Sequence, residues 1–457
     1  MSNKVDTGTG EADGGQTLVP KARFPEFQDA WQRLPMNQVY RFKGNNPFSR
    51  DQLNYEQGDL KTIHYGDIHT KFSASFRASN ELVPFINRGE YHSSLKEENW
   101  CSVGDIVFAD ASEDMNDIGK AIEIIDAGDV PLTAGMHTIL ARPELHEMAV
   151  GFGCYVFASR YVRQQIQREA QGAKVLGISP TRLGSIKLPI PIDVSEQRRI
   201  ADCLSSLDDL ILAEEERLAA LGDYKKGLIQ QLFPRPERVE NGEKIPAETA
   251  PRLRFPEFQD AGEWVETTIG EIGSFYYGKS APKWSLEESA PTPCVRYGEL
   301  YTKFGPLITE TYSRTNIAPE NLKFSKGGEI LVPRVGEKPD DFGRNCSLLT
   351  LSGVAIGEMI SVFETNQNAL FYTFYFRHIY RQFAKVVEGQ NVKNLYYAEL
   401  EPLKIYRPSL PEQAKIAECL LSFEQLVDAS EVKVADLRRH KSGLMQQLFP
   451  SPVERGA

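Results

Sequence analysis

The sequence contains an internal repeat, and this repeat constrains the fold more than any other feature of the chain. Five stretches recur in the same order in its two parts. The matching pairs are residues 23–30 with 254–261, 65–72 with 297–304, 104–108 with 328–332, 195–204 with 411–420, and 224–234 with 440–450. Repetition of this kind indicates two copies of one structural module.

The offset between the copies changes along the chain. The last two pairs, which begin at 195 and 411 and at 224 and 440, share one offset, whereas the entry motifs 23–30 and 254–261 have a larger one. The copies therefore share a frame but differ in inserted loops, as expected if one scaffold carries two specificities. The predicted boundaries are a disordered tail (1–20), a first body (21–193), a first long helix (194–233), a linker (234–253), a second body (254–408) and a second long helix (409–449).

Composition places the chain among ordinary globular proteins. Its 457 residues exceed what a single core usually serves, and 41% are hydrophobic while 25% are charged. The six cysteines form no CxxC pair, so we expect neither a zinc site nor a disulfide framework.

No apolar run would span a bilayer and no signal peptide begins the sequence, which favours the cytoplasm and no membrane partner. The net charge of -11 is unusual for a DNA-binding protein, although a local basic groove would suffice.

After each body, apolar residues step alternately by four and three, the spacing of a coiled-coil helix. Eight of ten positions are apolar in each series, and the polar exceptions (Glu214 and Lys225, Ser430 and Lys441) match between the copies. The predicted interface residues are Ile200, Leu204, Leu207, Ile211, Leu218 and Leu221 in the first helix, and Ile416, Leu420, Phe423, Val427, Val434 and Leu437 in the second.

Two arrangements of these helices are open. Each helix could pack only on its own body, or the two could pair as an antiparallel coiled coil. A helix of about 38 residues extends about 57 Å, more than one compact body needs, and the strict spacing in both copies favours the pair. The bodies contain short Val, Ile, Phe and Tyr runs broken by Gly, Pro and Asn, together with helical stretches. The predicted fold class is therefore α+β: two pseudo-symmetric mixed bodies separated by two long, antiparallel helices.

Variable bodies, each followed by a similar helix that starts near (S/P)-E-Q-x-x-I-A and ends in G-L-x-Q-Q-L-F-P, resemble the specificity subunit of Type I restriction-modification systems. The resemblance covers about residues 23–450. It implies two target recognition domains that read a bipartite, asymmetric DNA target in the major groove, with the coiled coil acting as a ruler between the half-sites. It also implies that the chain itself is non-catalytic and binds no cofactor.

The resemblance further implies partners. These are double-stranded DNA, two adenine-methylating modification subunits that use S-adenosylmethionine, and restriction subunits that use ATP and Mg²⁺. The similar helices of the two copies would contact the two identical modification subunits, and the divergent bodies would read different DNA.

The resemblance places three DNA-facing loops in each body: after its opening strand, after the strand 104–108 or 328–332, and before its last strand. Lys and Arg suit phosphates and Asn suits adenine, whereas Asp110 and Glu113 would repel phosphates but accept from cytosine. For any one residue, a solvated loop side chain remains the alternative. The predicted contacts are Arg41, Lys43, Asn45, Asn46, Ser112, Lys174 and Ser179 in the first body, and Lys279, Lys283, Trp284, Arg334, Lys338, Asn391, Lys393 and Asn394 in the second.

Other functional motifs are weaker. Residues 273–280 fit the phosphate-loop pattern GxxxxGK(S/T), but the intervening aromatics and Pro282 argue against it. No (D/N)PP(Y/F) tetrapeptide supports a methyltransferase, and the seven histidines make no metal-binding pattern. Two alternatives to DNA recognition stay open: a scaffold whose two modules grip protein partners, and an enzyme with an unrecognised site.

Overall fold

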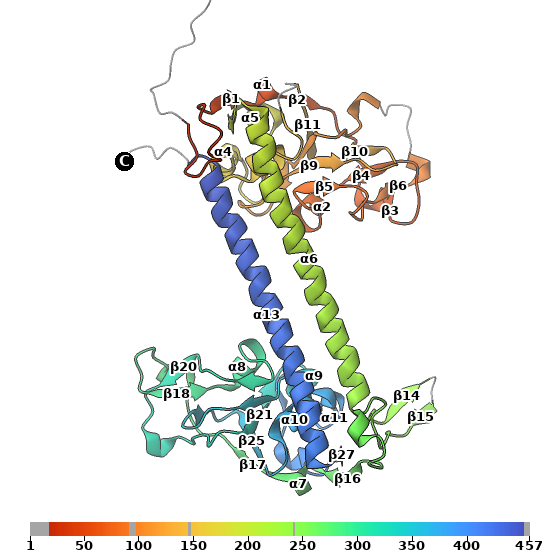
Figure 1. The fold of residues 1–457 in the computed structure, drawn as a ribbon, viewed down its shortest axis with the longest axis vertical. Coiled ribbons are helices and arrows are strands. Elements are labelled where there is room, and N and C mark those ends of the chain that lie inside the picture. The colour runs from red at the N-terminus through yellow and green to blue at the C-terminus, as the bar shows by residue number, and fades with distance from the viewer. Residues whose placement is uncertain (1–17, 91–96, 145–147, 241–242, 452–457) are drawn as a thin grey trace, which may run out of the picture. The chain divides into compact units, whose positions relative to one another are not determined.

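The chain forms two compact units. The computed structural model describes residues 18–90, 97–144, 148–240 and 243–451, and Figure 1 labels many of their helices and strands. One unit comprises residues 1–215 with 433–457, and the other comprises residues 216–432. Each unit thus holds one body, the first half of that body's own long helix and the last half of the other. Most of the predicted N-terminal tail lies outside the described residues, whereas Leu18 is buried and pairs with Trp31.

The first body is built on a five-stranded sheet in which only the last pair, β9 and β5, is parallel. Its central strand β7 is buried on both faces, as its sequence Ile-Val-Phe-Ala requires. A second, four-stranded sheet contains the order β10-β4-β6-β3. The first sheet runs β2 (Tyr40–Lys43), β11 (Thr138–Pro143), β7 (Ile106–Ala109), β9 (Ala121–Asp126) and β5 (Ser75–Arg77); the second runs β10 (Leu132–Ala134), β4 (Lys61–Ile63), β6 (Phe85–Ile86) and β3 (Leu53–Asn54).

The second body repeats this architecture strand for strand in its main sheet. Again only the last pair, β23 and β19, is parallel. A three-stranded sheet takes the place of the four-stranded one. The main sheet runs β17 (Gly273–Tyr277), β25 (Ile360–Thr365), β21 (Glu329–Pro333), β23 (Ser347–Leu349) and β19 (Leu307–Ile308); the smaller one runs β20 (Ser313–Thr315), β18 (Thr292–Val295) and β24 (Ala355–Ile356).

Short helices and a terminal strand pair complete each body. The pair is β1 (Gln32–Pro35) with β13 (Lys187–Ile190) in the first, and β16 (Val265–Thr268) with β27 (Lys404–Arg407) in the second. The helices of the first body are α1 (Met36–Val39), α2 (Tyr65–Thr70), α3 (Gly153–Ala158), α4 (Arg160–Glu169) and α5 (Pro180–Ser185). Those of the second are α7 (Ile269–Ile272), α8 (Tyr297–Thr302), α9 (Pro339–Arg344), α10 (Ala369–His378), α11 (Tyr380–Lys385) and α12 (Tyr397–Leu400).

The copies differ in loops, as the changing offset predicts. Helix α9 follows the central strand of the second body, where residues 113–119 of the first form turns and bends. The predicted linker contains a hairpin of β14 (Arg238–Glu240) and β15 (Glu243–Ile245). The first five residues of the stretch 273–280, which fits the phosphate-loop pattern, form strand β17, so they do not form a loop around a phosphate.

The two long helices pair in opposite directions within each unit. They are α6 (Val194–Leu232) and α13 (Leu410–Leu448), close to the predicted bounds. In the second unit Lys225 pairs with Glu424 at 2.5 Å. In the first unit the equivalent residues, Lys441 and Asp208, form the same ion pair. A residue late in one helix thus meets one early in the other, which is the predicted antiparallel arrangement.

The predicted coiled-coil interface is buried, and some of its residues also belong to the hydrophobic cores of the bodies. All twelve predicted interface residues are buried or half-buried. Ile200 and Leu204 also belong to the core of the first body, and Ile416 and Leu420 belong to that of the second. The two arrangements considered for the helices therefore coexist: each helix begins on its own body and then pairs with the other helix.

Each body binds the start of its own long helix through a buried carboxylate. Arg23 donates to both oxygens of Glu196 at 2.7 Å, and the Trp31 Nε1 donates to the same carboxylate at 3.1 Å. Arg254 and Trp264 repeat these contacts on Glu412 at 2.6–2.7 and 3.2 Å. This explains why the arginine of the entry motif, the tryptophan after it and the helical glutamate recur together in the sequence.

Each body also encloses the end of the other repeat's helix. In the first unit Phe449 stacks on Phe152 with 5.9 Å between ring centroids and meets the edge of Trp31. In the second unit Phe233 stacks on Tyr375 at 5.1 Å. The recurring Gln-Gln-Leu-Phe-Pro motif therefore completes the core of the partner repeat.

The second of these junctions contains a titratable group. His378 stacks on Phe233, and its Nε2 is buried without a partner among the described residues. Burial lowers the pKa of His378 from 6.5 to about 4. Because the folded state resists this protonation, its contribution to stability is complete above about pH 6.5 and is lost as the pH falls toward 4.

We therefore expect the second unit to lose up to about 3 kcal/mol of stability between pH 7 and pH 4 from this residue. His378→Gln, which can still donate a hydrogen bond but cannot titrate, should flatten the pH dependence of its melting temperature. His440→Gln, at an exposed position, is the control. An unchanged pH profile in His378→Gln would contradict the assignment.

Candidate nucleic-acid interface

In each body, the second and third predicted loops join as a two-stranded ribbon. In the first body β8 (Ala111–Ser112) pairs with β12 (Leu176–Gly177), antiparallel. In the second, β22 (Val335–Gly336) pairs with β26 (Lys393–Asn394) in the same way. Loops that lie far apart in the sequence thus form one surface element in each copy.

Residues 110 and 334 occupy the same backbone frame next to this ribbon. The backbone amide of Asp110 donates to the His137 carbonyl, and that of Arg334 donates to the Met359 carbonyl, both at 3.0 Å. The carbonyls of Asp110 and Arg334 accept from the backbone amides of Ile178 and Leu395, both at 2.9 Å. The next carbonyl is held in both copies as well, by His69 Nε2 on Ala111 and by the Tyr301 hydroxyl on Val335, each at 3.0 Å. One scaffold therefore presents an acid in one body and an arginine in the other.

Arg334 brings the three predicted loops of the second body together. Its guanidinium carbon lies 4.5 Å from the ring centre of Tyr277, where the first loop begins, and 5.3 Å from that of Tyr396, beyond the third. Among the described residues no carboxylate lies within ion-pair distance of Arg334, and its buried Nε has no hydrogen-bond partner. A planar cation held between aromatic rings, without a counter-ion of its own, is suited to bind an external acceptor.

The corresponding position of the first body is acidic. The Asp110 carboxylate lies 3.2 Å from His137 Nδ1, and the His137 ring meets the edge of Tyr65 at 5.2 Å. Burial raises the pKa of Asp110 above its usual value, while His137 partly opposes this effect. The His137 backbone has a φ of 54°. A residue other than glycine with its backbone in the left-handed region is uncommon, and such residues cluster at functional sites.

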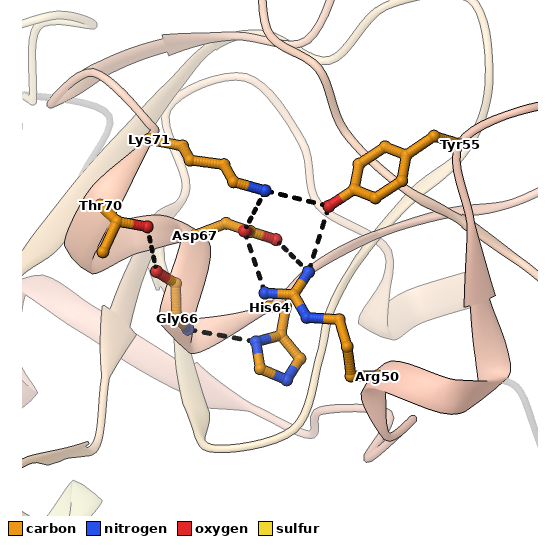
Figure 2. Close-up of polar contacts among 7 residues, drawn as sticks. All are labelled: Arg50, Tyr55, His64, Gly66, Asp67, Thr70 and Lys71. Carbon is orange, nitrogen blue, oxygen red and sulfur yellow. Dashed lines mark hydrogen bonds and ion pairs between the residues drawn. The ribbon is translucent and has the colours of Figure 1, made fainter. Parts of the chain in front are cut away.

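A buried carboxylate fixes helix α2 beside this position. Figure 2 shows Asp67 between two cations: it accepts from Arg50 at 2.7 and 3.0 Å and pairs with Lys71 at 3.0 Å. Tyr55 accepts from both cations, and the His64 ring accepts from the Gly66 amide at the start of α2. These bonds hold the pKa of Asp67 below its usual value despite its burial. Arg50 and Lys71 remain about half exposed, so the network leaves one net positive charge at the surface.

The predicted contacts of the first body fall into two groups. Asn46 and Ser112 are engaged inside the body: Asn46 is buried and donates to Thr133, and Ser112 is buried and accepts from the Asp114 amide. Lys43 is half-buried, and the others are exposed, although Ser179 caps helix α5, Arg41 pairs with Glu144 and Asn45 donates to the Thr138 carbonyl; the remaining exposed residue is Lys174.

The predicted contacts of the second body are mostly accessible. Trp284 is 75% exposed, and Lys338 stands at the start of α9. Ser280 and Ala281, between Lys279 and Lys283, both have φ above 60°, so this loop is strained without glycine. The exposed members are Lys279, Lys283, Trp284, Lys338 and Asn391, and the half-buried ones are Arg334, Lys393 and Asn394.

Sequence reasoning missed the aromatic and basic residues around positions 110 and 334. Tyr277, Tyr396, Tyr65, His137 and Arg50 were not among the predicted contacts. Tyr65 does begin a recurring motif, which was a signal for its position, but its contacts depend on strands far away in the sequence. Within the described part of the chain, no group of three or more His, Cys, Asp or Glu could hold a metal ion. Nor is any described helix long and apolar enough to cross a membrane.

The two bodies share one architecture but present different side chains, Asp110 and Arg334, from the same backbone position. This is the arrangement of a duplicated recognition protein. Its relatives agree with this class. The family described as "Type I restriction modification DNA specificity domain" matches residues 51–222 and 261–436, which together are more than half of the chain. The chain therefore belongs to the type I restriction-modification specificity family and carries its DNA specificity domain twice.

Individual relatives are distant but similar over most of their length. Two come from Methanocaldococcus jannaschii. The putative type I restriction enzyme MjaX specificity subunit is 23% identical over 80% of this chain and 84% of its own length, and the MjaVIII specificity subunit is 23% identical over 65% and 70%. The crystal structure of the S subunit from M. genitalium is 14% identical, covers 95% of this chain and 100% of its own, and superposes with a TM-score of 0.59. That similarity concerns the fold.

Proposed function

We propose that the chain reads a two-part, asymmetric duplex DNA target, one half with each body, on behalf of modification and restriction subunits. The observation that carries this proposal is the pair of equivalent frames at residues 110 and 334, which present opposite charges. Identical bodies would read a symmetric target, whereas these two differ where the loops meet.

Accessible cations near these frames would contact phosphates, which supply most of the affinity for DNA. The exposed ones are Arg50, Lys71 and the predicted Lys174 in the first body, and the predicted Lys279, Lys283 and Lys338 in the second; the predicted Lys43 and Lys393 are half-buried. Asn46 and Ser112 are left out of this set, because both side chains are buried and bonded within the body. The methyl donor, ATP and Mg²⁺ would reside on the partner subunits.

A selection experiment tests this function. The chain, purified with an adenine methyltransferase partner, should enrich from a random duplex pool one sequence made of two unlike blocks with a fixed spacer. Enrichment of nothing, or of a single continuous block, would contradict the proposal. Binding of the partner without DNA selection would instead favour the alternative of a protein scaffold.

The two long helices would set the length of the spacer. Seven residues would be inserted after Glu215 and seven after Val432. One full heptad in each helix keeps the four-three spacing of the coiled-coil interface, and the contacts within each unit are kept because the units divide at these points. The insertions add about 10 Å of helix, or about three base pairs. We expect the selected spacer to lengthen by about that amount with both blocks unchanged. A change in either block would show that the helices do not act as a ruler.

A further inference from the structure

We infer that residues 110 and 334 are the same base-reading position in the two bodies, where Arg334 recognises a guanine and Asp110 recognises the amino group of a cytosine. This inference rests on the proposed function and assigns the chemistry of one base pair in each half-site. Its starting point is the shared frame, in which three hydrogen bonds to the backbone recur with equal lengths in the two copies.

The surroundings of Arg334 suit guanine. Guanine offers two acceptors, O6 and N7, on its major-groove edge, and the guanidinium fork can bind both at once. Tyr277 and Tyr396 fix the plane of this fork before DNA arrives, which lowers the entropy lost on binding. Because no described carboxylate pairs with Arg334, its charge is available to the duplex.

The surroundings of Asp110 suit a base that donates. A carboxylate that faced the phosphates would be repelled, so an acid at the protein–DNA surface is favourable only opposite an exposed N–H group. Cytosine presents its N4 amino group in the major groove and is the usual partner of Asp. His137 Nδ1, at 3.2 Å, orients the carboxylate.

A purely structural role for this position fits these observations less well. A residue that only supported the ribbon would be expected to keep its character, because the two hydrogen bonds of its own amide and carbonyl join backbone groups and are the same in both bodies. Here the backbone bonds are kept while the side chain changes from Asp to Arg, and its neighbours change with it. This is the pattern of a position at which specificity is set.

The test uses the complex with its methyltransferase partner and the duplex that the wild-type complex selects. Affinities are measured for that duplex and for versions with one base pair changed at each position of both blocks. In Arg334→Gln, discrimination at one guanine of one block should fall from about tenfold or more to less than about threefold. Asp110→Asn, which keeps the shape of the side chain, should do the same at one cytosine of the other block.

Two further variants separate base reading from folding. Arg344→Gln removes another arginine that lies over a tyrosine ring in the second body, Tyr380 at 4.1 Å, and should leave every discrimination unchanged. Arg334→Lys keeps the charge without the fork and should retain a weaker preference for the same guanine. Near-ultraviolet circular dichroism of each complex reports whether the tyrosine environment is intact.

Three results would overturn the inference while leaving the proposed function in place. These are a uniform loss of affinity over all duplexes in Arg334→Gln and Arg334→Lys, a change at a base pair other than G·C, and changes from both Arg334→Gln and Asp110→Asn in the same block. The proposed function fails separately, if the wild-type complex selects no two-part sequence.

Discussion

Glu196→Ala should lower the free energy of unfolding of the first unit by about 3–5 kcal/mol, as measured by urea denaturation. Removal of this carboxylate leaves the Arg23 guanidinium, only 13% exposed, without its ion-pair partner. It also leaves the buried Trp31 N–H without an acceptor. Glu412→Ala should have the same effect in the second unit through Arg254 and Trp264.

Glu215→Ala is the matched control. This glutamate lies on the same helix and pairs with Arg438, but both side chains are accessible, at 35% and 65% exposed. Such pairs contribute at most about 1 kcal/mol. If Glu196→Ala cost no more than Glu215→Ala, the buried carboxylate would not be what attaches the helix to the body.

Phe449→Ala should destabilise the first unit by a similar amount, about 3–5 kcal/mol. Its ring is 2% exposed and packs on Phe152 and Trp31, so the substitution leaves a cavity in the core of the first body. Phe233→Ala should act in the same way on the second body through Tyr375.

Val432→Ala, at a position on α13 that is 60% exposed, should change stability by less than about 0.5 kcal/mol. The change in Trp31 fluorescence upon unfolding, with the other tryptophans replaced by Phe, identifies the unit affected. If the first body of Phe449→Ala unfolded at the same urea concentration as the wild type, the docked ring would contribute nothing to stability.

The repeat and the two helices could be predicted from the sequence because both depend on local patterns. The four-three spacing predicted two long helices where α6 and α13 lie. Its polar exceptions Lys225 and Lys441 matched between the copies, but the ion pairs that they form with Glu424 and Asp208 were not predicted. The sequence also indicated mixed bodies and where their loops differ.

The composition of the candidate interface could not be predicted in the same way. Arg334 was found as a loop cation, but its neighbours Tyr277 and Tyr396 come from segments far from it in the chain, and no local pattern links them. Asn46 fits an adenine contact by type, yet the fold buries it against Thr133. Docking of Phe449 into the first body is equally invisible to periodicity, since it depends on the complete tertiary structure.

That docking also has a consequence for biosynthesis. Trp31 and Phe449, which touch in the first body, lie near opposite ends of the chain. At about 5–20 residues per second, the ribosome needs on the order of ten to fifty seconds to add the part that follows the first body. During that time the apolar surface around Trp31 and Phe152 has no ring to cover it. We therefore expect the nascent first body to depend on chaperones until the last helix emerges.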